Sequence, residues 1–197
     1  MTFSPEGRQL CYEEYDFADG HGVVKRRLLL LDRRGGSHKE LTWGAAPLLN
    51  PHWSPTGQRI AMDALGLDGH RRALLLIPGA PADTITPLVV PGRKDRETRV
   101  LSWSPDGQRL LVLEGQRDLC VWDVRLGQTP QRGRRIGWDP YIHAAAWSRG
   151  GEAVAYVGGQ AQYEAQDHGV FLNVWSPKQG VEAVPMPDGL RPMSIDW

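Results

Sequence analysis

The sequence predicts an all-β protein that is built from repeated antiparallel sheets. First, the chain of 197 residues contains 23 glycines and 15 prolines, which are frequent turn formers. Second, short apolar runs rich in leucine, β-branched and aromatic residues lie between these turn formers, and no stretch keeps a helical spacing of apolar residues over three turns. Third, one short motif recurs along the chain at nearly constant spacing. Together these observations predict strands that are joined by tight turns in several similar units.

The recurring motif consists of an aromatic residue, a serine, two turn residues and a glycine. Its four copies read FSPEG at 3–7, WSPTG at 53–57, WSPDG at 103–107 and WSRGG at 147–151, and a partial copy, IDW, stands at 195–197. The leading aromatic residues are therefore 50, 50, 44 and 50 residues apart. Proline fixes φ, aspartate or threonine caps the turn, and glycine accepts a positive φ, so the motif predicts a tight turn between two strands. The motif residues that we expect to support the fold are Phe3, Pro5, Gly7, Trp53, Pro55, Gly57, Trp103, Pro105, Asp106, Gly107, Trp147, Gly151 and Trp197.

Further apolar runs follow each motif copy, so that each unit has four predicted strands. The first strand ends at the leading aromatic residue, and the second strand follows the turn directly. The second strands are expected at 9–12, 59–62, 109–112 and 153–156, the third at 28–31, 73–77, 119–122 and 171–175, and the fourth at 39–43, 84–90, 134–138 and 181–186. Consecutive strands joined by short turns predict an antiparallel four-stranded meander in each unit.

A four-stranded meander that repeats every 44 to 50 residues is typical of a β-propeller blade. A lone blade has two exposed faces, so blades must pack against one another to bury them. We therefore expect the motif tryptophans to pack between blades rather than to stack on sugars or bases. The predicted fold class is an all-β β-propeller with four blades per chain, in a single domain over 1–197. The blade units are expected at about 3–46, 47–96, 97–140 and 141–190, with a closing strand at 191–197.

The two ends of the sequence bear on how such a ring closes. The first strand of the first blade is short, whereas 191–197 looks like a first strand without a blade of its own. In a closed propeller this C-terminal strand completes the first blade beside residues 8–15 and removes free sheet edges. Three arrangements are open: a four-bladed ring made by one chain, an eight-bladed ring made by a homodimer that exchanges these strands, and part of a longer propeller.

The pattern of an apolar residue, Trp-Ser-Pro-Asp-Gly and a second apolar strand resembles the WD40-like propeller repeat of the TolB-like and prolyl-oligopeptidase propeller families. The copy of this pattern at residues 103–110 is the nearest to the family repeat. The copy at 53–60 differs from it by a threonine in place of the aspartate, and the copy at 3–10 has Phe in place of Trp and Glu in place of Asp. The copy at 147–154 lacks the proline. The resemblance covers essentially the whole chain and implies the propeller fold, but it does not define an activity. The Gly-His and Trp-Asp signature of true WD40 repeats is not met.

Composition narrows the functional classes. The 23 basic residues balance 23 acidic ones, whereas nucleic-acid-binding proteins are normally basic, so no nucleic-acid partner is expected. The longest apolar runs, such as 28–31, are far shorter than the roughly 20 residues that a membrane helix needs. Cys11 and Cys120 lie far apart in apolar runs, which predicts two buried free thiols rather than a zinc site. We expect no cofactor.

The sequence as written begins without the basic and apolar segments of a secretory signal. This beginning predicts a cytoplasmic protein. Because TolB proteins are typically exported, the resemblance implies a periplasmic location if the true N-terminus is missing.

The loops between the second and third strands vary most among the units, and they share one face of the predicted propeller. Insertions on one face of a repeat protein often mark its binding side. The candidate partner-binding residues in these loops are Asp19, His21, Asp68, His70, Tyr163, Glu164, Asp167 and His168. Asp and His are also metal-ligand types, but equivalent loops of different blades are one blade spacing apart, and Asp-Gly is a common hairpin turn. We therefore predict no metal site.

The sequence lacks the nucleophile elbow Gly-x-Ser-x-Gly, the phosphate-binding loop and the zinc motif His-Glu-x-x-His. His52, His143 and Asp196 are candidates to line a channel, but a lone histidine there is more often structural. We therefore predict no catalytic residue and a non-enzymatic binding or scaffolding propeller for a protein or peptide partner. Two alternatives remain. One is an accessory propeller that gates a prolyl-oligopeptidase-type hydrolase, and the other is a propeller enzyme that uses its channel residues.

Overall fold

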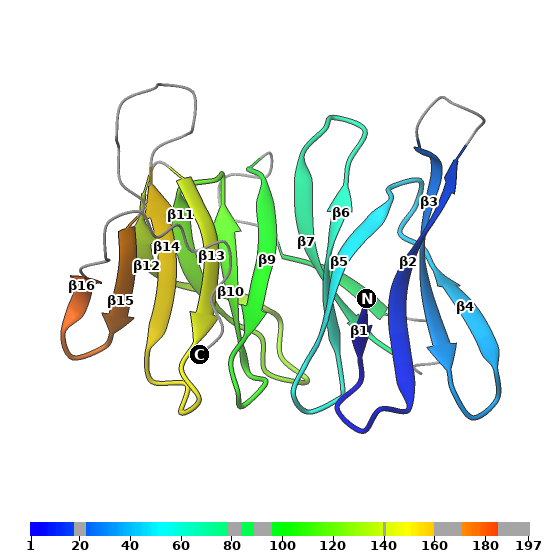
Figure 1. Cartoon of the computed structure of the whole chain (residues 1–197), viewed down its shortest axis with the longest axis horizontal. Coiled ribbons are helices and arrows are strands. Elements are labelled where there is room, and N and C mark those ends of the chain that lie inside the picture. Colours follow the sequence, from blue (N-terminus) through cyan, green and yellow to red (C-terminus); the bar gives the residue numbers. More distant parts are fainter. Residues whose placement is uncertain (18–22, 79–83, 89–95, 140, 160–170, 185–197) are drawn as a thin grey trace. The chain divides into compact units, whose positions relative to one another are not determined.

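The computed structural model describes residues 1–17, 23–78, 84–88, 96–139, 141–159 and 171–184, and these residues contain strands and turns but no helix. Within the described residues, sixteen strands form four antiparallel sheets of four strands each, in chain order (Figure 1). The predicted all-β class and the predicted four-stranded units are confirmed. The chain divides into two compact units, Met1–Val100 and Leu101–Trp197, which are described separately. The single domain over 1–197 stays a prediction, and the expected closing strand at 191–197 lies outside the described residues.

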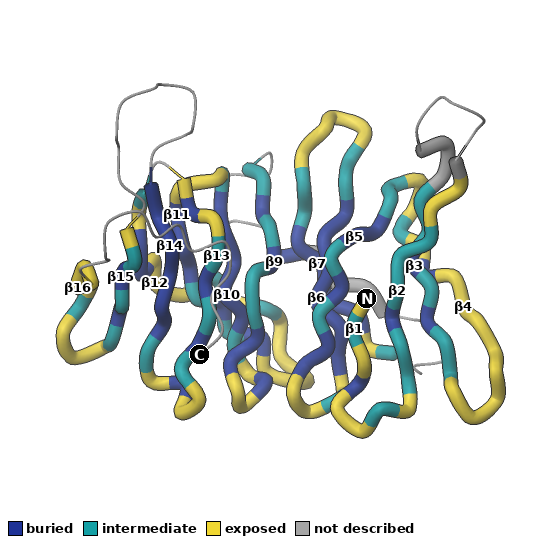
Figure 2. The backbone as a smooth tube through the Cα atoms, in the orientation of Figure 1, coloured by how far each residue is buried: buried dark blue, intermediate teal, exposed yellow. Residues whose placement is uncertain are grey.

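The first unit contains two sheets. The first sheet consists of β1 (Thr2–Phe3), β2 (Gln9–Phe17), β3 (Val23–Asp32) and β4 (Ser37–Leu41), and the second of β5 (Leu48–Trp53), β6 (Ile60–Leu65), β7 (Arg71–Ile77) and β8 (Thr84–Pro87). Alternate side chains of a strand point to the same face, so each sheet offers an apolar face to the other. The shared core includes Cys11, Leu28, Leu30 and Leu41 from the first sheet and Trp53, Ile60, Met62, Leu74 and Leu76 from the second. Figure 2 shows buried backbone along β6 and β7 and exposed backbone at the turns.

The second unit contains the other two sheets. The boundary between the units falls within β9, the first strand of the third sheet, so that its first three residues belong to the first unit. The third sheet consists of β9 (Thr98–Trp103), β10 (Arg109–Glu114), β11 (Asp118–Asp123) and β12 (Gln131–Trp138), and the fourth of β13 (Tyr141–Trp147), β14 (Val154–Gly159), β15 (Phe171–Ser176) and β16 (Gly180–Val184). Their core includes Leu111, Leu113, Leu119 and Ile136 from the third sheet and Ile142, Trp147, Val154, Tyr156 and Trp175 from the fourth. Each motif copy thus joins the first two strands of one sheet.

Each motif copy forms the tight turn that the sequence predicts. The motif glycines have positive φ angles of 66° at Gly7, 72° at Gly57, 67° at Gly107 and 69° at Gly151. Glycine adopts this region without the strain that a Cβ atom would cause. The copy at 147–151 keeps the turn without proline, because its second glycine supplies the same conformation as in the other copies.

The motif serine has a role that the sequence analysis missed. Its hydroxyl accepts a hydrogen bond from the backbone N–H five residues later, with donor–acceptor distances of 2.9 Å at Ser4, 3.1 Å at Ser54, 2.9 Å at Ser104 and 3.0 Å at Ser148. Its own backbone N–H donates to the carbonyl of that same later residue in all four copies. Two hydrogen bonds therefore close every motif turn across its base.

The motif tryptophans are core residues, as the sequence predicts. Trp53, Trp103 and Trp147 are 7%, 7% and 4% exposed. Phe3 differs, because it is 51% exposed and the guanidinium of Arg33 lies 5.9 Å from the centre of its ring. The reason is its place in the fold: Phe3 belongs to the first sheet and points away from the second sheet, and no other sheet of the first unit packs against that face. Trp197 lies outside the described residues.

The two cysteines are free and buried, which confirms the prediction for Cys11 and Cys120. Burial raises the pKa of each thiol to about 12. A search of the described residues for a helix that could cross a membrane finds none.

Candidate functional site

The turn between β6 and β7 carries two of the predicted partner-binding residues, Asp68 and His70. Asp68 accepts hydrogen bonds from the backbone N–H of His70 at 3.0 Å and from Nη1 of Arg72 at 3.1 Å. These bonds, the one from Arg72 foremost, hold the pKa of Asp68 well below its usual range. The backbone N–H of Gly66 donates to the carbonyl of His70 at 2.9 Å. The turn is therefore held by its own hydrogen bonds.

The apolar side chain of Leu67 takes no part in these hydrogen bonds and lies at the surface. Leu67 is 95% exposed at the tip of the turn, and His70 is exposed as well. Asp68 is engaged in the turn rather than available as a ligand. The other predicted loop residues, namely Asp19, His21, Tyr163, Glu164, Asp167 and His168, lie outside the described residues. No group of three or more His, Cys, Asp or Glu side chains among the residues that the structure describes could hold a metal ion.

A buried polar network in the first unit was not predicted. It centres on Asn50, at an irregularity of the β5–β6 register between Leu49 and His52, where Asn50 has a positive φ of 52°. The backbone N–H of Asn50 donates to Oε1 of Glu13 at 2.8 Å. Its side-chain Nδ2 donates to Oδ2 of Asp63 at 3.2 Å and to the carbonyl of Val100 at 3.1 Å. One asparagine thus connects β2, β6 and β9.

Asp63 is the most buried acid of this network. It is 0% exposed and accepts a hydrogen bond from the backbone N–H of Val100 at 2.8 Å, while Nη1 of Arg71 lies 3.9 Å from Oδ2. Burial raises its pKa to about 6 in spite of these partners, because removal from water disfavours the charged carboxylate. Asp63 therefore becomes ionised only near neutral pH.

His52, one of the candidate channel residues, belongs to the same network. Its Nε2 lies 3.0 Å from Oδ1 of Asn50, an amide oxygen that can only accept, so Nε2 carries the proton in this contact. Burial lowers its pKa to about 4, and the ring is neutral at neutral pH. In the second unit, His143 is exposed on β13. Asp196 lies outside the described residues, so the three candidate channel residues are not brought together by any described contact.

Glu13 links this network to an aromatic and cationic cluster. Oε2 of Glu13 accepts hydrogen bonds from Nε of Arg26 at 3.0 Å and from the Tyr15 hydroxyl at 2.5 Å, and the guanidinium of Arg26 lies 4.8 Å from the centre of the Tyr15 ring. Burial alone would raise the pKa of Glu13, but the hydrogen bonds from Tyr15, the Asn50 amide and Arg26 outweigh it and hold that pKa below its usual value. Glu13 is therefore a charged, fully engaged carboxylate.

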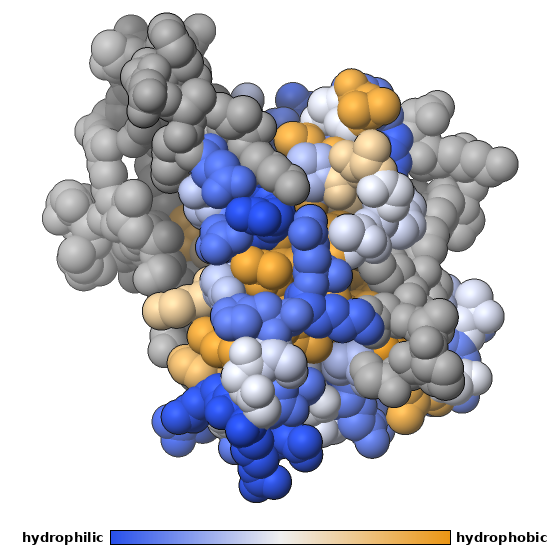
Figure 3. Space-filling model, turned by 90° about the vertical axis from the view of Figure 1, so that its right-hand side faces the viewer, coloured by the Kyte–Doolittle hydropathy of each residue, from blue (hydrophilic) through white to orange (hydrophobic). Residues whose placement is uncertain are grey.

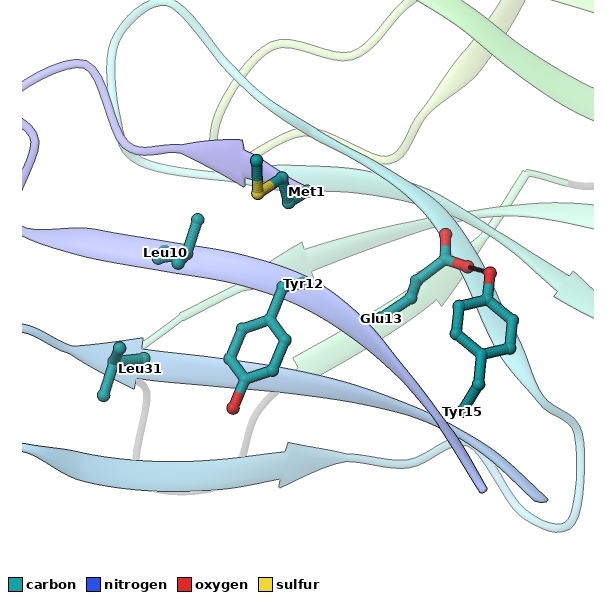
Figure 4. Close-up of a pocket in the computed structure, with 6 residues that line it drawn as sticks. All are labelled: Met1, Leu10, Tyr12, Glu13, Tyr15 and Leu31. Atoms are coloured by element: carbon teal, nitrogen blue, oxygen red, sulfur yellow. Dashed lines mark hydrogen bonds between the residues drawn. The ribbon is translucent and has the colours of Figure 1, made fainter. Parts of the chain in front are cut away.

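A shallow pocket of about 500 Å³ lies beside β2, at the end of β1 (Figure 4). Its lining combines apolar side chains with a carboxylate and two phenols: Met1, Leu10, Tyr12, Glu13, Tyr15 and Leu31. The hydroxyl of Tyr12 is 2.8 Å from Nδ1 of His38, which fixes the ring over the sheet. The pocket offers apolar contact next to a strand edge.

An ion pair with a buried carboxylate and a partly exposed arginine lies in the third sheet. Glu114 is 0% exposed, and Nε of Arg132 lies 2.8 Å from its Oε1 and 3.0 Å from its Oε2. Nε1 of Trp122 also donates to Oε1, at 3.1 Å. Since these carboxylate contacts come from neighbouring strands of one sheet, they connect β10, β11 and β12.

Solved structures provide the comparison that defines the fold. TolB from Acinetobacter baumannii is similar with a TM-score of 0.61 and 14% identity, over 92% of this chain and 41% of that chain. The chain has a TolB-like β-propeller fold. The hydrazine synthase of Kuenenia stuttgartiensis is also similar, with a TM-score of 0.57 and 13% identity, over 93% of this chain and 57% of that chain.

These similarities extend to the fold and no further, because sequence identity is low and one fold hosts many functions. The chain spans less than two thirds of the length of either solved structure. Neither the protein-family models nor the curated proteins compared with this sequence gave a match.

Proposed function

We propose that this TolB-like chain is a non-enzymatic binding propeller that presents its hairpin turns to a protein or peptide partner. The observation that carries this proposal is the β6–β7 turn, where a leucine that is 95% exposed stands on a turn closed by Asp68 and Arg72. A rigid turn loses little conformational entropy on binding, so apolar contact at its tip contributes fully to affinity.

The free energy available at this tip is useful for recognition. Burying a leucine side chain contributes about 1.5–3 kcal/mol, which corresponds to roughly a tenfold to hundredfold gain in affinity. The polar network of the first unit supports a binding role over catalysis, because Glu13, Asp63 and His52 all make hydrogen bonds within the protein. Through these hydrogen bonds, the three side chains hold Asn50, which connects strands of the first unit.

Selection from a displayed library of random peptides tests the proposal. The immobilised full chain should enrich peptides that share a consensus, and Leu67→Ser should weaken binding of the enriched peptides at least tenfold. Leu126→Ser is the matched control, since Leu126 is a leucine that is 51% exposed in another turn. Enrichment of no consensus, or equal binding by the wild type and Leu67→Ser, contradicts the proposal.

A further inference from the structure

The motif copy of the fourth sheet holds an arginine that comes from the neighbouring third sheet. The guanidinium of Arg109 lies 4.6 Å from the centre of the Trp147 ring, and its Nη2 donates to the carbonyl of Gly151 at 3.0 Å. Trp147 begins this motif copy and Gly151 ends it. The aromatic ring attracts the cation through its electron-rich face, and the carbonyl accepts an N–H. One motif turn thus provides both contacts for a guanidinium group.

The motif copy of the first sheet makes the same two contacts with a different arginine. Phe3 begins this copy and Gly7 ends it. The guanidinium of Arg33 lies 5.9 Å from the centre of the Phe3 ring, and its Nη1 donates to the carbonyl of Gly7 at 3.0 Å. Arg33 belongs to the turn between β3 and β4, so this arginine comes from the first sheet itself. It occupies the place that Arg109 occupies in the fourth sheet.

The backbone of a motif sheet does not require an arginine at the position of Arg33. The backbone N–H of Arg33 donates to the carbonyl of Arg8, the residue after the motif glycine. In the third sheet, the corresponding bond runs from the N–H of Val124 to the carbonyl of Gln108. Since a valine makes the same backbone bond, the arginine side chain is free to serve another purpose. Its printed contacts are those with Phe3 and the motif turn.

The contact of Arg33 is looser than that of Arg109. Its guanidinium is farther from the ring, and a phenylalanine ring attracts a cation less than a tryptophan ring does. Phe3 is 51% exposed, whereas Trp147 is 4% exposed. Figure 3 shows the side of the molecule that carries β3 and β4 in Figure 1, where hydrophilic and apolar side chains lie next to one another at the surface. An arginine suits such a mixed surface, because it has an apolar stem and a charged head.

We propose that the Phe3 ring and the Gly7 carbonyl form a binding site for an arginine side chain of a protein or peptide partner, and that Arg33 occupies this site as a competitor in the free chain. The planar guanidinium can lie on the ring while one of its N–H groups donates to the carbonyl, which the ammonium of a lysine does less well. This inference rests on the proposed role in peptide binding and assigns a preferred side chain to the partner.

The test is an NMR titration of the 15N-labelled full chain with a blocked Gly-Arg-Gly peptide. We expect saturable shifts of the backbone amides of Gly7 and Arg8. A site that its own competitor leaves open for about a fifth of the time binds about fivefold more weakly than its intrinsic affinity allows. Arg33→Ala should therefore bind the arginine peptide about fivefold more tightly than the wild type. The peptide Gly-Lys-Gly should bind this variant about fivefold more weakly than the arginine peptide.

Matched variants separate competition from a general change of charge. Arg34→Ala removes the same charge from the same exposed turn and should change binding by less than about twofold, because exposed charges are screened by salt. Phe3→Leu, added to Arg33→Ala, keeps an apolar side chain but removes the ring, and should reduce binding about fivefold. Because Phe3, Arg33 and Arg34 are all exposed, these variants should keep the fold.

The outcomes distinguish this inference from the proposed function. Equal binding by Arg33→Ala and Arg34→Ala, or equal binding of the arginine and lysine peptides, overturns the arginine site. If library peptides then bind in a way that Leu67→Ser weakens, the proposed function stands without this site. If no library peptide is enriched either, the peptide-binding function fails as a whole.

Discussion

The carboxylate of Asp63 makes a measurable prediction about stability against pH. Its side chain is 0% exposed, and burial raises its pKa from an ordinary 3.8 to about 6. In the unfolded chain the carboxyl recovers the ordinary pKa. The folded state therefore holds its proton more tightly than the unfolded state does, and stability falls as the pH rises through the folded pKa. A difference of about two pKa units corresponds to roughly 3 kcal/mol in total.

Substitution of Asp63 by asparagine removes this titration while keeping the shape of the side chain. The asparagine oxygen can still accept the hydrogen bond from the Val100 N–H that Asp63 accepts at 2.8 Å. Between about pH 4.5 and pH 8, the unfolding free energy of the wild type relative to Asp63→Asn should fall by about 2 kcal/mol. At the acidic end of this pH range, Asp63 is protonated, so the folded state does not carry the free-energy cost of burying a charged carboxylate.

Urea unfolding followed by circular dichroism at several pH values measures this difference. Asp106→Asn is the control of opposite sign: burial alone would raise the pKa of Asp106, but hydrogen bonds from Ser104 and the Gln108 N–H and the charge of Arg109 lower it. That variant should lose stability relative to the wild type only as the pH rises to the ordinary pKa of 3.8, and the difference should stay constant between about pH 4.5 and pH 8. Parallel pH profiles of the wild type and Asp63→Asn would refute the reasoning about Asp63.

Three more predictions concern buried groups. Ser104→Ala should cost about 1–2 kcal/mol in urea unfolding, because it leaves a backbone N–H at the base of a motif turn without its acceptor. Glu114→Gln should destabilise by about 2 kcal/mol, less than for a fully buried pair because Arg132 is 30% exposed, and adding Arg132→Met should recover part of the loss. Cys11 and Cys120, whose pKa values burial raises to about 12, should react with a thiol reagent at pH 8 only after unfolding. A fast reaction in the native protein would contradict that burial.

The strands and the motif turns could be predicted from the sequence because their signals are local. The glycine at the end of each motif copy fulfils a conformational need that few other residues can meet, as its φ of 67° at position 107 shows. Trp53 and Trp147 are core residues because each packs between the two sheets of its own compact unit. Phe3 departs from the pattern because burial depends on a neighbour, which sequence position alone does not supply.

The polar network could not be predicted in the same way. Asn50, Glu13, Asp63 and Val100 are far apart in the sequence, and only the fold of the first unit, which ends at Val100, brings them together. One signal was available, since Asp63 stands alone in the apolar run Ile60–Leu65. A single carboxylate inside an otherwise buried strand indicates buried hydrogen-bond partners, but their identity depends on long-range pairing.

The serine of each motif turn has a consequence for how the chain folds. Both hydrogen bonds that it makes span only five residues, so closing the turn costs little chain entropy. Each hairpin at a motif can form before any sheet has met its neighbour, and contacts of short sequence separation accelerate folding. The four serines therefore give the chain four independent starting points for folding, spread along its length, from which the sheets grow.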